Sequence, residues 1–334
     1  MSVHPLDWVA REVLRQFPAV SPSDRIQSLG NLGGFSGASL WRVEGASGRP
    51  LCLRAWPQDF SRDRLLWIHQ LMQVARHAGL DFVPEVFATA QWITALEHSG
   101  RLWDLTAWMS GRANFEERPT PARLHAACTA LARLHQTWSG QDPQIGPCPA
   151  VTRRLQQLRA WRSLIESGWK PSFHSADQDP VRPWAERGWL ILHGQANWVA
   201  RALAAWTDKS FRLQPCLCDI WHDHVLFHGE TVTGLIDYGG VKVDHPAVDL
   251  ARLLGSMIGD DVILRANALD VYARLRPLTW EERELITVLD ETGTILGVAT
   301  WLKWLYEERR PFEDPRAVSA RLAKLVARVE KWKM

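Results

Sequence analysis

Two aspartates, Asp219 and Asp237, stand in a stretch whose residue types could serve phosphoryl transfer. Asp219 follows the apolar run Cys216–Cys218, and Asp237 ends the apolar segment Val232–Ile236. Two carboxylates presented in this way can hold a divalent cation and orient a hydroxyl group. Phosphoryl transfer asks for those two elements, because its catalysis consists mainly of positioning and charge neutralisation.

The same stretch resembles the catalytic segment of the aminoglycoside phosphotransferase and choline kinase-like family, which shares the protein-kinase-like fold. That family has His-Gly-Asp, a variable segment, Asn and, further on, Ile-Asp-Phe/Trp-Gly. Asp219 falls on the catalytic aspartate, and Asp237, followed by Tyr238-Gly239, falls on the metal-binding aspartate. The run His245–Ala251 matches a downstream Asp-Pro-x-x-Asp-Leu-Ala, so the resemblance implies that Asp249 braces the catalytic loop.

Four positions depart from the family pattern. Leu217-Cys218 replaces His-Gly, His224 replaces the metal-binding Asn, and His245 replaces the Asp before proline. Mg²⁺ prefers oxygen ligands and binds imidazole poorly. Either His224 binds the cation through water, or the protein uses Mn²⁺, or Asp223 takes part, or metal binding is weakened. A zinc site at 222–224 is not favoured, because neighbouring residues point in different directions and no third partner is evident.

The resemblance also implies where ATP and its cation, Mg²⁺ or Mn²⁺, bind. Glycines let the backbone approach phosphates closely, and a glycine-rich run precedes the first predicted strand pair. The implied metal ligands are His224 and Asp237. The implied ATP-binding residues are Gly33, Gly34, Phe35, Ser36 and Gly37 in the glycine-rich run, Arg54 on the following strand, and Ala107 and Met109 at the hinge.

Arg54 has no partner of the usual kind in the sequence. In the family, the basic residue on this strand pairs with a glutamate on the following helix. Between Glu44 and Glu85 the only acidic residues are Asp59 and Asp63, and His69 lies near the expected position.

The order of elements predicts an α+β, bilobal protein-kinase-like fold. Helical periodicity covers 6–17 and 62–78, and short apolar runs predict strands at 38–43, 50–56, 82–90, 91–96 and 101–109. After residue 120 the pattern is mainly helical, with short strands within 216–227 and 232–236. We expect a nucleotide-binding lobe of residues 1–110, with its leading helix at 6–17, and a catalytic and substrate-binding lobe of residues 111–334.

Composition narrows the classes of function. The chain of 334 residues has a net charge of only +2, which gives no general case for binding nucleic acid or a membrane surface. Five scattered cysteines do not form a disulfide framework. The N-terminus lacks an uninterrupted apolar core, and no window approaches the ~18 to 20 apolar residues of a membrane-spanning helix. We expect a cytoplasmic protein, and the sequence does not predict its oligomeric state.

These features together predict an ATP-dependent phosphotransferase that moves the γ-phosphate to a hydroxyl of a small molecule, with Asp219 accepting or orienting the hydroxyl proton. The alternative is a pseudokinase-like nucleotide-binding or regulatory protein without turnover, suggested by the departures at 217–218 and 224. The sequence does not identify the acceptor. A polycationic acceptor would need an acidic pocket, for which the candidates are Asp260, Asp261, Glu281 and Glu282.

Overall fold

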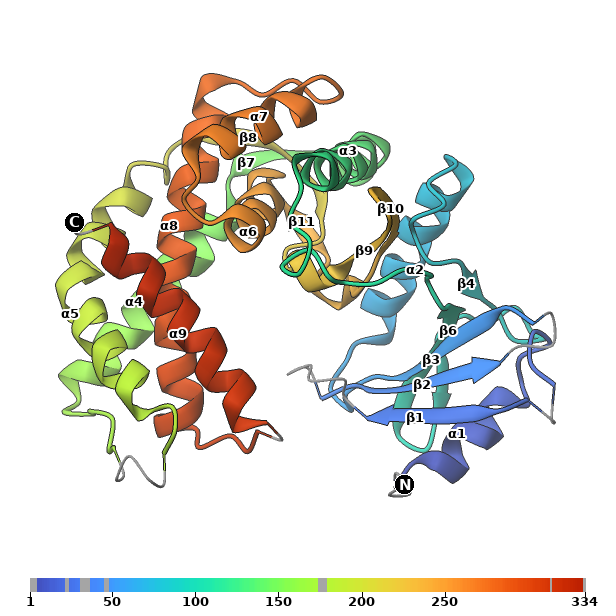
Figure 1. Ribbon diagram of the computed structural model, residues 1–334. Helices are drawn as coiled ribbons and strands as arrows, with labels where there is room; N and C mark the ends of the chain where they lie inside the picture. The colour runs from blue at the N-terminus through green and yellow to red at the C-terminus, as the bar shows by residue number, and fades with distance from the viewer. Residues whose placement is uncertain are drawn as a thin grey trace. The chain divides into compact units, whose positions relative to one another are not determined.

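The computed structural model describes residues 5–21, 24–30, 37–44, 48–173, 179–312 and 314–332 (Figure 1). The chain divides into two compact units. One comprises Met1–Trp138 with His222–Gly239, and the other comprises Ser139–Trp221 with Gly240–Met334. We describe each unit by itself. This division groups residues by their contacts with one another and does not test where a lobe begins. The lobe boundary expected between residues 110 and 111 therefore stays a prediction.

The first unit contains a six-stranded antiparallel sheet in the order β1-β2-β3-β6-β4, with β5 also paired to β6. Alternation along β3 sends Leu51, Leu53 and Ala55 to one face and Arg54 to the other. The strands are β1 (Ile26–Gly30), β2 (Ser39–Glu44), β3 (Pro50–Ala55), β4 (Val86–Phe87), β5 (Leu96–His98) and β6 (Arg101–Ala107).

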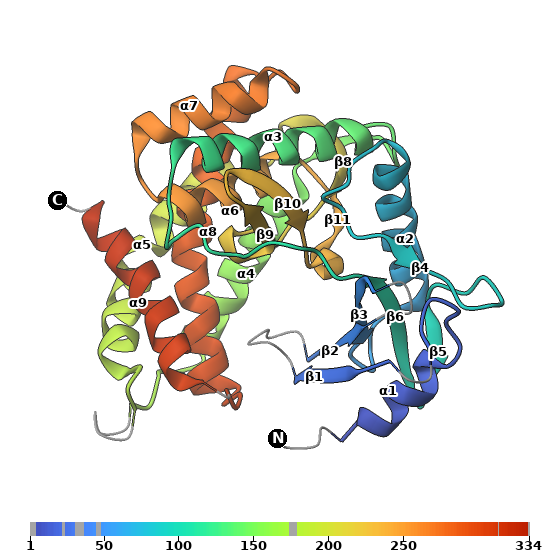
Figure 2. The same ribbon diagram turned by 45° about the vertical axis from the view of Figure 1, so that its right-hand side comes forward.

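Helices cover both faces of this sheet, as Figures 1 and 2 show. On one face α1 (Asp7–Leu14) buries Val9 and Val13 in a core with Leu53 and Leu105 of the sheet. On the other face α2 (Arg62–His77) buries Leu65 in a smaller cluster with residues that include Leu102. Ser61 caps the N-terminus of α2, because its side chain accepts the Arg64 N–H. A third helix, α3 (Pro121–Trp138), packs on α2.

A hairpin from later in the chain completes the first unit. It consists of β9 (Val225–His228) and β10 (Thr231–Leu235), preceded by the 3-10 turn η1 (His222–His224). Gly111 lies so close to the hairpin that a Cβ there would stand 2.9 Å from the carbonyl oxygen of Phe227, so this contact requires glycine. A second 3-10 turn, η2 (Tyr238–Gly240), follows the strand β10 and Asp237.

The second unit is mainly helical, and α8 packs against α4, α5, α6 and α9. A capping box at Thr279 and Glu282 begins α8. A three-stranded sheet in the order β11-β8-β7 also belongs to this unit. The elements are β7 (Gln144–Pro147), α4 (Pro149–Glu166), α5 (Arg182–Ala204), β8 (Ser210–Cys216), β11 (Lys242–Asp244), α6 (Ala247–Ile258), α7 (Val262–Ala273), α8 (Trp280–Leu302), the π-helical turn η3 (Lys303–Glu307) and α9 (Pro315–Lys331).

One described helical segment, Trp280–Glu307, is long and apolar enough to cross a membrane by length and composition alone. The sequence pattern had predicted no membrane-spanning segment. Of the most apolar window of Trp280–Glu307, 67% is buried inside the protein. Its apolar residues are therefore used for packing in the core of the second unit.

The strand expected at 91–96 is wrong, and the one expected at 82–90 shrinks to Val86–Phe87. The intervening segment is instead a turn centred on Thr89, whose hydroxyl oxygen accepts the N–H groups of Gln91 and Ile93. Trp92 within this turn has a left-handed φ of 62° and is exposed. A local side-chain bond has replaced the strand pairing that the apolar residues suggested.

Candidate active-site residues

Asp249 anchors the loop that carries Asp219, as the resemblance implies. Asp249 is fully buried in the first turn of α6. Its two carboxylate oxygens accept the backbone N–H groups of Leu217 at 2.7 Å and Cys218 at 2.6 Å. Hydrogen bonds to an ionised acceptor are shorter and stronger than neutral ones, so the backbone just before Asp219 is held firmly.

The backbone at Cys218 has a conformation that glycine adopts easily, and glycine is the residue that the family has at this position. The φ of 62° at Cys218 lies in the left-handed region, which side chains other than glycine adopt at a cost of about 1 to 2 kcal/mol. Burial, with the charges of Asp249 and Asp244, raises the pKa of the Cys218 thiol well above its ordinary value. The thiol therefore stays protonated at neutral pH and is not a nucleophile.

Asp219 presents an exposed carboxylate next to an arginine that the sequence reading did not single out. The Asp219 side chain is 55% exposed, and its Oδ1 accepts from Arg252 Nη2 at 2.7 Å and Nε at 3.1 Å. Arg252 stands three residues after Asp249 on α6, a spacing that places both on one side of the helix. That spacing was the only signal in the sequence that could have found Arg252.

The structure brings three of the predicted site residues together in the first unit. Asp237 Oδ1 lies 3.4 Å from Arg54 Nη1, and Asp237 Oδ2 lies 3.7 Å from His224 Nε2. Burial would raise the pKa of Asp237, but the positive Arg54 and the neighbouring His224 lower it below its ordinary value. Asp237 is thus an anion at neutral pH, as a metal ligand must be.

Arg54 projects from β3 on the face that α2 covers. Its guanidinium lies 4.8 Å from the centre of the Trp56 ring, a cation–π contact. Burial would lower the pKa of Arg54, yet the carboxylates of Asp237 and Asp104 raise it above its ordinary value. Arg54 therefore keeps its positive charge in this partly buried place.

The helix α2 carries His69 near the position where the resemblance places a glutamate. His69 Nε2 lies 3.0 Å from Asp104 Oδ2, and both residues are almost completely buried. Five residues earlier on α2, Arg64 donates to the carbonyl oxygen of Gly239 at 2.7 Å. The sequence reading named His69 but missed Asp104, because Asp104 comes from a strand that is distant in sequence.

The hinge residues pack against the β9–β10 hairpin. A Cβ on Gly234 would stand 2.9 Å from Met109 Cβ, and Thr233 donates to the carbonyl oxygen of Ser110 at 2.6 Å. The Ala107 N–H already donates to the carbonyl oxygen of Glu85 at 2.8 Å. An adenine contact at Ala107 would therefore have to use its carbonyl oxygen.

Only one residue of the predicted glycine loop belongs to the part of the chain that the structure describes. Gly33, Gly34, Phe35 and Ser36 lie outside the described residues. Gly37 is described, and its φ of 73° requires a glycine or strains any other residue.

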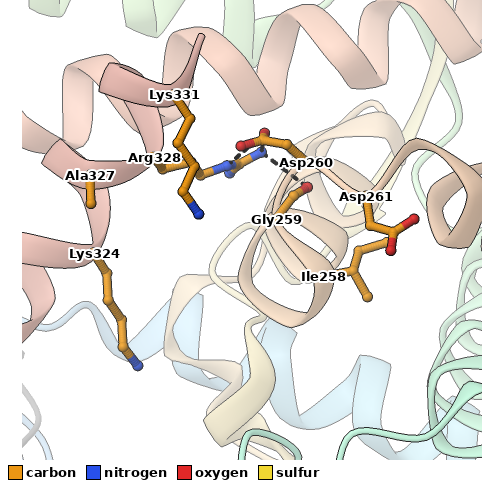
Figure 3. A pocket seen from close by; sticks show the side chains of 8 residues that line it. All are labelled: Ile258, Gly259, Asp260, Asp261, Lys324, Ala327, Arg328 and Lys331. Carbon is orange, nitrogen blue, oxygen red and sulfur yellow. Dashed lines mark hydrogen bonds and ion pairs between the residues drawn. The ribbon is translucent and has the colours of Figure 1, made fainter. Parts of the chain in front are cut away.

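The acidic residues considered for a polycationic acceptor are each engaged elsewhere in the second unit. Asp260 pairs with Arg328 at 2.8 Å beside a pocket of about 490 Å³ (Figure 3). Asp261 caps α7, and Glu281 pairs with Lys209 at 3.0 Å. Glu282 lies 3.0 Å from His245 and accepts from Arg276 at 2.9 Å. Asp260 and Asp261 line that pocket together with Lys324, Arg328 and Lys331, so basic residues balance the acids there.

A sheet with a basic residue facing a helix, and a helical unit with an anchored aspartate loop, are the features that the resemblance to kinase-like phosphotransferases predicts. The chain belongs to the phosphotransferase enzyme family, which it matches over residues 30–286. Among solved structures it is similar to spectinomycin phosphotransferase in complex with ADP and spectinomycin, with a TM-score of 0.73, 11% identity and 99% of each chain covered.

A second similar structure is amicoumacin kinase in complex with AMP-PNP and Ca²⁺, with a TM-score of 0.67 and 13% identity, covering 97% of this chain and 93% of that one. At these identities the likeness shows the fold, and the predicted α+β protein-kinase-like fold is confirmed. A curated relative is the homoserine kinase of Rhodopseudomonas palustris (strain BisB18), 27% identical over 190 residues. The match covers 55% of this chain and 52% of that kinase, so the chain spans about half the length of this relative.

Proposed function

We propose that the protein is an ATP-dependent kinase that transfers the γ-phosphoryl group of ATP to a hydroxyl of a small molecule. The anchored loop before Asp219 carries this proposal. Asp249 holds both peptide N–H groups that precede Asp219, at 2.7 and 2.6 Å. A phosphotransferase must fix the group that orients its acceptor, and Asp219 here accepts or orients the proton of the acceptor hydroxyl.

Asp237 and His224 are the residues that would hold a divalent cation. Their nearest atoms, Oδ2 and Nε2, are 3.7 Å apart, so a carboxylate and an imidazole would both be available to one ion. Imidazole nitrogen suits Mn²⁺ better than Mg²⁺, so we propose Mn²⁺ as the preferred ion. When bound, the cation would neutralise charge on the phosphate oxygens.

The remaining ATP contacts follow the family pattern. We propose that Arg54 leaves Asp237 and binds the α- and β-phosphates, for which its forked guanidinium is well suited. The glycine run 33–37 would cover the phosphates with its backbone N–H groups. Adenine would lie against the hinge, at the Ala107 carbonyl and at Met109.

We propose further that the acceptor carries a carboxylate. Arg252 lies 2.7 Å from Asp219, so an acceptor whose hydroxyl reaches Asp219 comes within reach of a guanidinium. A guanidinium attracts a carboxylate and repels a polycation. The four acids that could have balanced a polycation are engaged elsewhere, and the curated relative is a homoserine kinase, whose named substrate is a hydroxy amino acid.

The test is an acceptor panel assayed for ADP release and for phosphorylated product, with Mn²⁺ and Mg²⁺. Homoserine is compared with 3-aminopropan-1-ol, which has the same skeleton without the carboxylate, and with choline and kanamycin. Asp219→Asn should abolish turnover, while Asp208→Asn, which changes an exposed carboxylate of the same unit, should not. A protein that binds no nucleotide with either cation contradicts the proposal, and a preference for 3-aminopropan-1-ol over homoserine contradicts the acceptor class.

A nucleotide-binding protein without turnover is the second candidate, and one observation favours it. An arginine engages each of the two central carboxylates, Arg252 on Asp219 and Arg54 on Asp237. A carboxylate that already accepts from an arginine has fewer lone pairs free for an acceptor hydroxyl or a cation. ATP binding without ADP formation from any acceptor, and no effect of Asp219→Asn on that binding, would identify this alternative.

A further inference from the structure

A buried histidine–carboxylate hydrogen bond connects α2 to the sheet near the position where the resemblance places a helix glutamate. His69 on α2 and Asp104 on β6 meet at 3.0 Å, and their side chains are only 2% and 7% exposed. Because a carboxylate can only accept, His69 Nε2 carries the proton and donates it. The orientation of Asp104 is therefore fixed by the helix.

Asp104 is also the direct neighbour of Arg54 across the sheet. The pairing of β3 with β6 places Arg54 opposite Asp104, so both side chains leave the same face. Residues opposite each other in an antiparallel pair have Cβ atoms about 4.5 to 5.5 Å apart. Asp104 accordingly contributes to raising the pKa of Arg54. An acid on the neighbouring strand thus stands beside Arg54 in place of an acid on the helix.

Arg54 needs such a second carboxylate if it is to change partners. It now contacts Asp237 Oδ1 at 3.4 Å, and a cation bound at the other oxygen, Oδ2, would repel its positive charge. A guanidinium has several donors in a fixed fork, so it can face a carboxylate on one side while it binds phosphate oxygens on another. Asp104 is the neighbouring carboxylate that stays in place, since His69 holds it.

The helix α2 contacts both sides of this arrangement. His69 binds Asp104 on the sheet, and Arg64, five residues earlier, donates to the Gly239 carbonyl at 2.7 Å. Gly239 follows Asp237 by two residues. A displacement of α2 would therefore disturb the carboxylate beside Arg54 and the backbone after Asp237 together.

We propose that Asp104 and His69 are positioning residues for Arg54, replacing the helix glutamate, and that through them α2 sets the geometry with which Arg54 holds the nucleotide phosphates. The inference rests on the proposed function, because Arg54 has a phosphate to hold only if the protein binds ATP. Neither residue touches the nucleotide. Both act through Arg54.

The test compares the affinities for ATP and adenosine, by calorimetry on the full chain, because adenosine has no phosphates. We expect Asp104→Asn and His69→Leu to weaken ATP binding about tenfold and to change adenosine binding less than about twofold. His69→Gln keeps an N–H donor and should retain most of the ATP affinity. His98→Leu is the matched control, because it removes another histidine–carboxylate pair of the same unit, with Glu12 at 3.2 Å.

A double-mutant cycle makes the test specific to Arg54. If Asp104 acts through Arg54, then adding Asp104→Asn to Arg54→Ala should not weaken ATP binding further. Equal losses of ATP and adenosine affinity, or additive losses in the cycle, would show a merely structural pair and overturn the inference. Asp104→Asn is isosteric, so it still decides the question should His69→Leu fail to fold. A wild-type protein that binds neither ligand overturns the proposed function, and this inference falls with it.

Discussion

Replacing Asp249 by asparagine should impair catalysis more than it impairs folding. Asparagine offers one carbonyl oxygen where Asp249 offers two carboxylate oxygens, so one of the N–H groups of Leu217 and Cys218 would face a donor. Hydrogen bonds to a charged group contribute about 1.5 to 3 kcal/mol each. Keeping one neutral bond and losing the other should cost roughly 2 to 4 kcal/mol in the free energy of unfolding.

For a unit of this size, such a loss lowers the Tm by roughly 5 to 15 °C, which tryptophan fluorescence can follow. The loop freed by the substitution carries Asp219, so we expect kcat to fall at least about tenfold with the KM for ATP little changed. Asp244→Asn is the control, because Asp244 is equally buried but accepts from Ala150 and His245 instead. Wild-type kcat in Asp249→Asn, or the same kcat loss in Asp244→Asn, would refute the reasoning.

Three further substitutions address the cation, the acceptor and acid stability. His224→Asn supplies an oxygen ligand, so the ratio of activity with Mg²⁺ to activity with Mn²⁺ should rise severalfold; an unchanged ratio means that His224 does not bind the cation. Arg252→Ala should raise the KM for a carboxylate-bearing acceptor about tenfold and leave the KM for ATP unchanged, and equal changes in both would exclude the acceptor contact. Burial would raise the pKa of Glu282, but His245 and Arg276 lower it to about 2 from an ordinary 4.5. This depressed pKa contributes roughly 3 kcal/mol of stability that is complete above pH 4.5 and disappears as the pH falls towards 2, so the deficit of Glu282→Gln in urea unfolding should shrink over that range. A deficit that does not change with pH would contradict this.

Patterns that are local in sequence predicted the structure well. The helix expected at 62–78 is found at Arg62–His77, because its apolar periodicity and the cap at Ser61 are set by neighbouring residues. The strands around Arg54 and the hairpin before Asp237 likewise lie close to where short apolar runs placed them. The proximity of Arg54, His224 and Asp237 could be expected only from the family resemblance, since no local rule joins residues so distant in the chain.

The partners of the site residues could not be read from the sequence. Asp104 stands beside Arg54 because β6 pairs with β3, and the register between two strands that do not follow each other in the chain is a tertiary property. Arg252 meets Asp219 through the anchor at Asp249, which is another long-range contact. The sequence shows that α2 lacks a glutamate. It does not show that Asp104 stands beside Arg54 instead.

Backbone strain and hydrogen bonding act together at the two central carboxylates. Among the described residues, six other than glycine have a left-handed φ, and these include Cys218, just before Asp219, and Asp237 itself. Such conformations persist only where surrounding contacts hold them. Asp249 supplies them for Cys218, while Arg54 and His224 lie against Asp237. The chain therefore keeps a costly left-handed backbone at both positions and holds it there with buried or charged contacts.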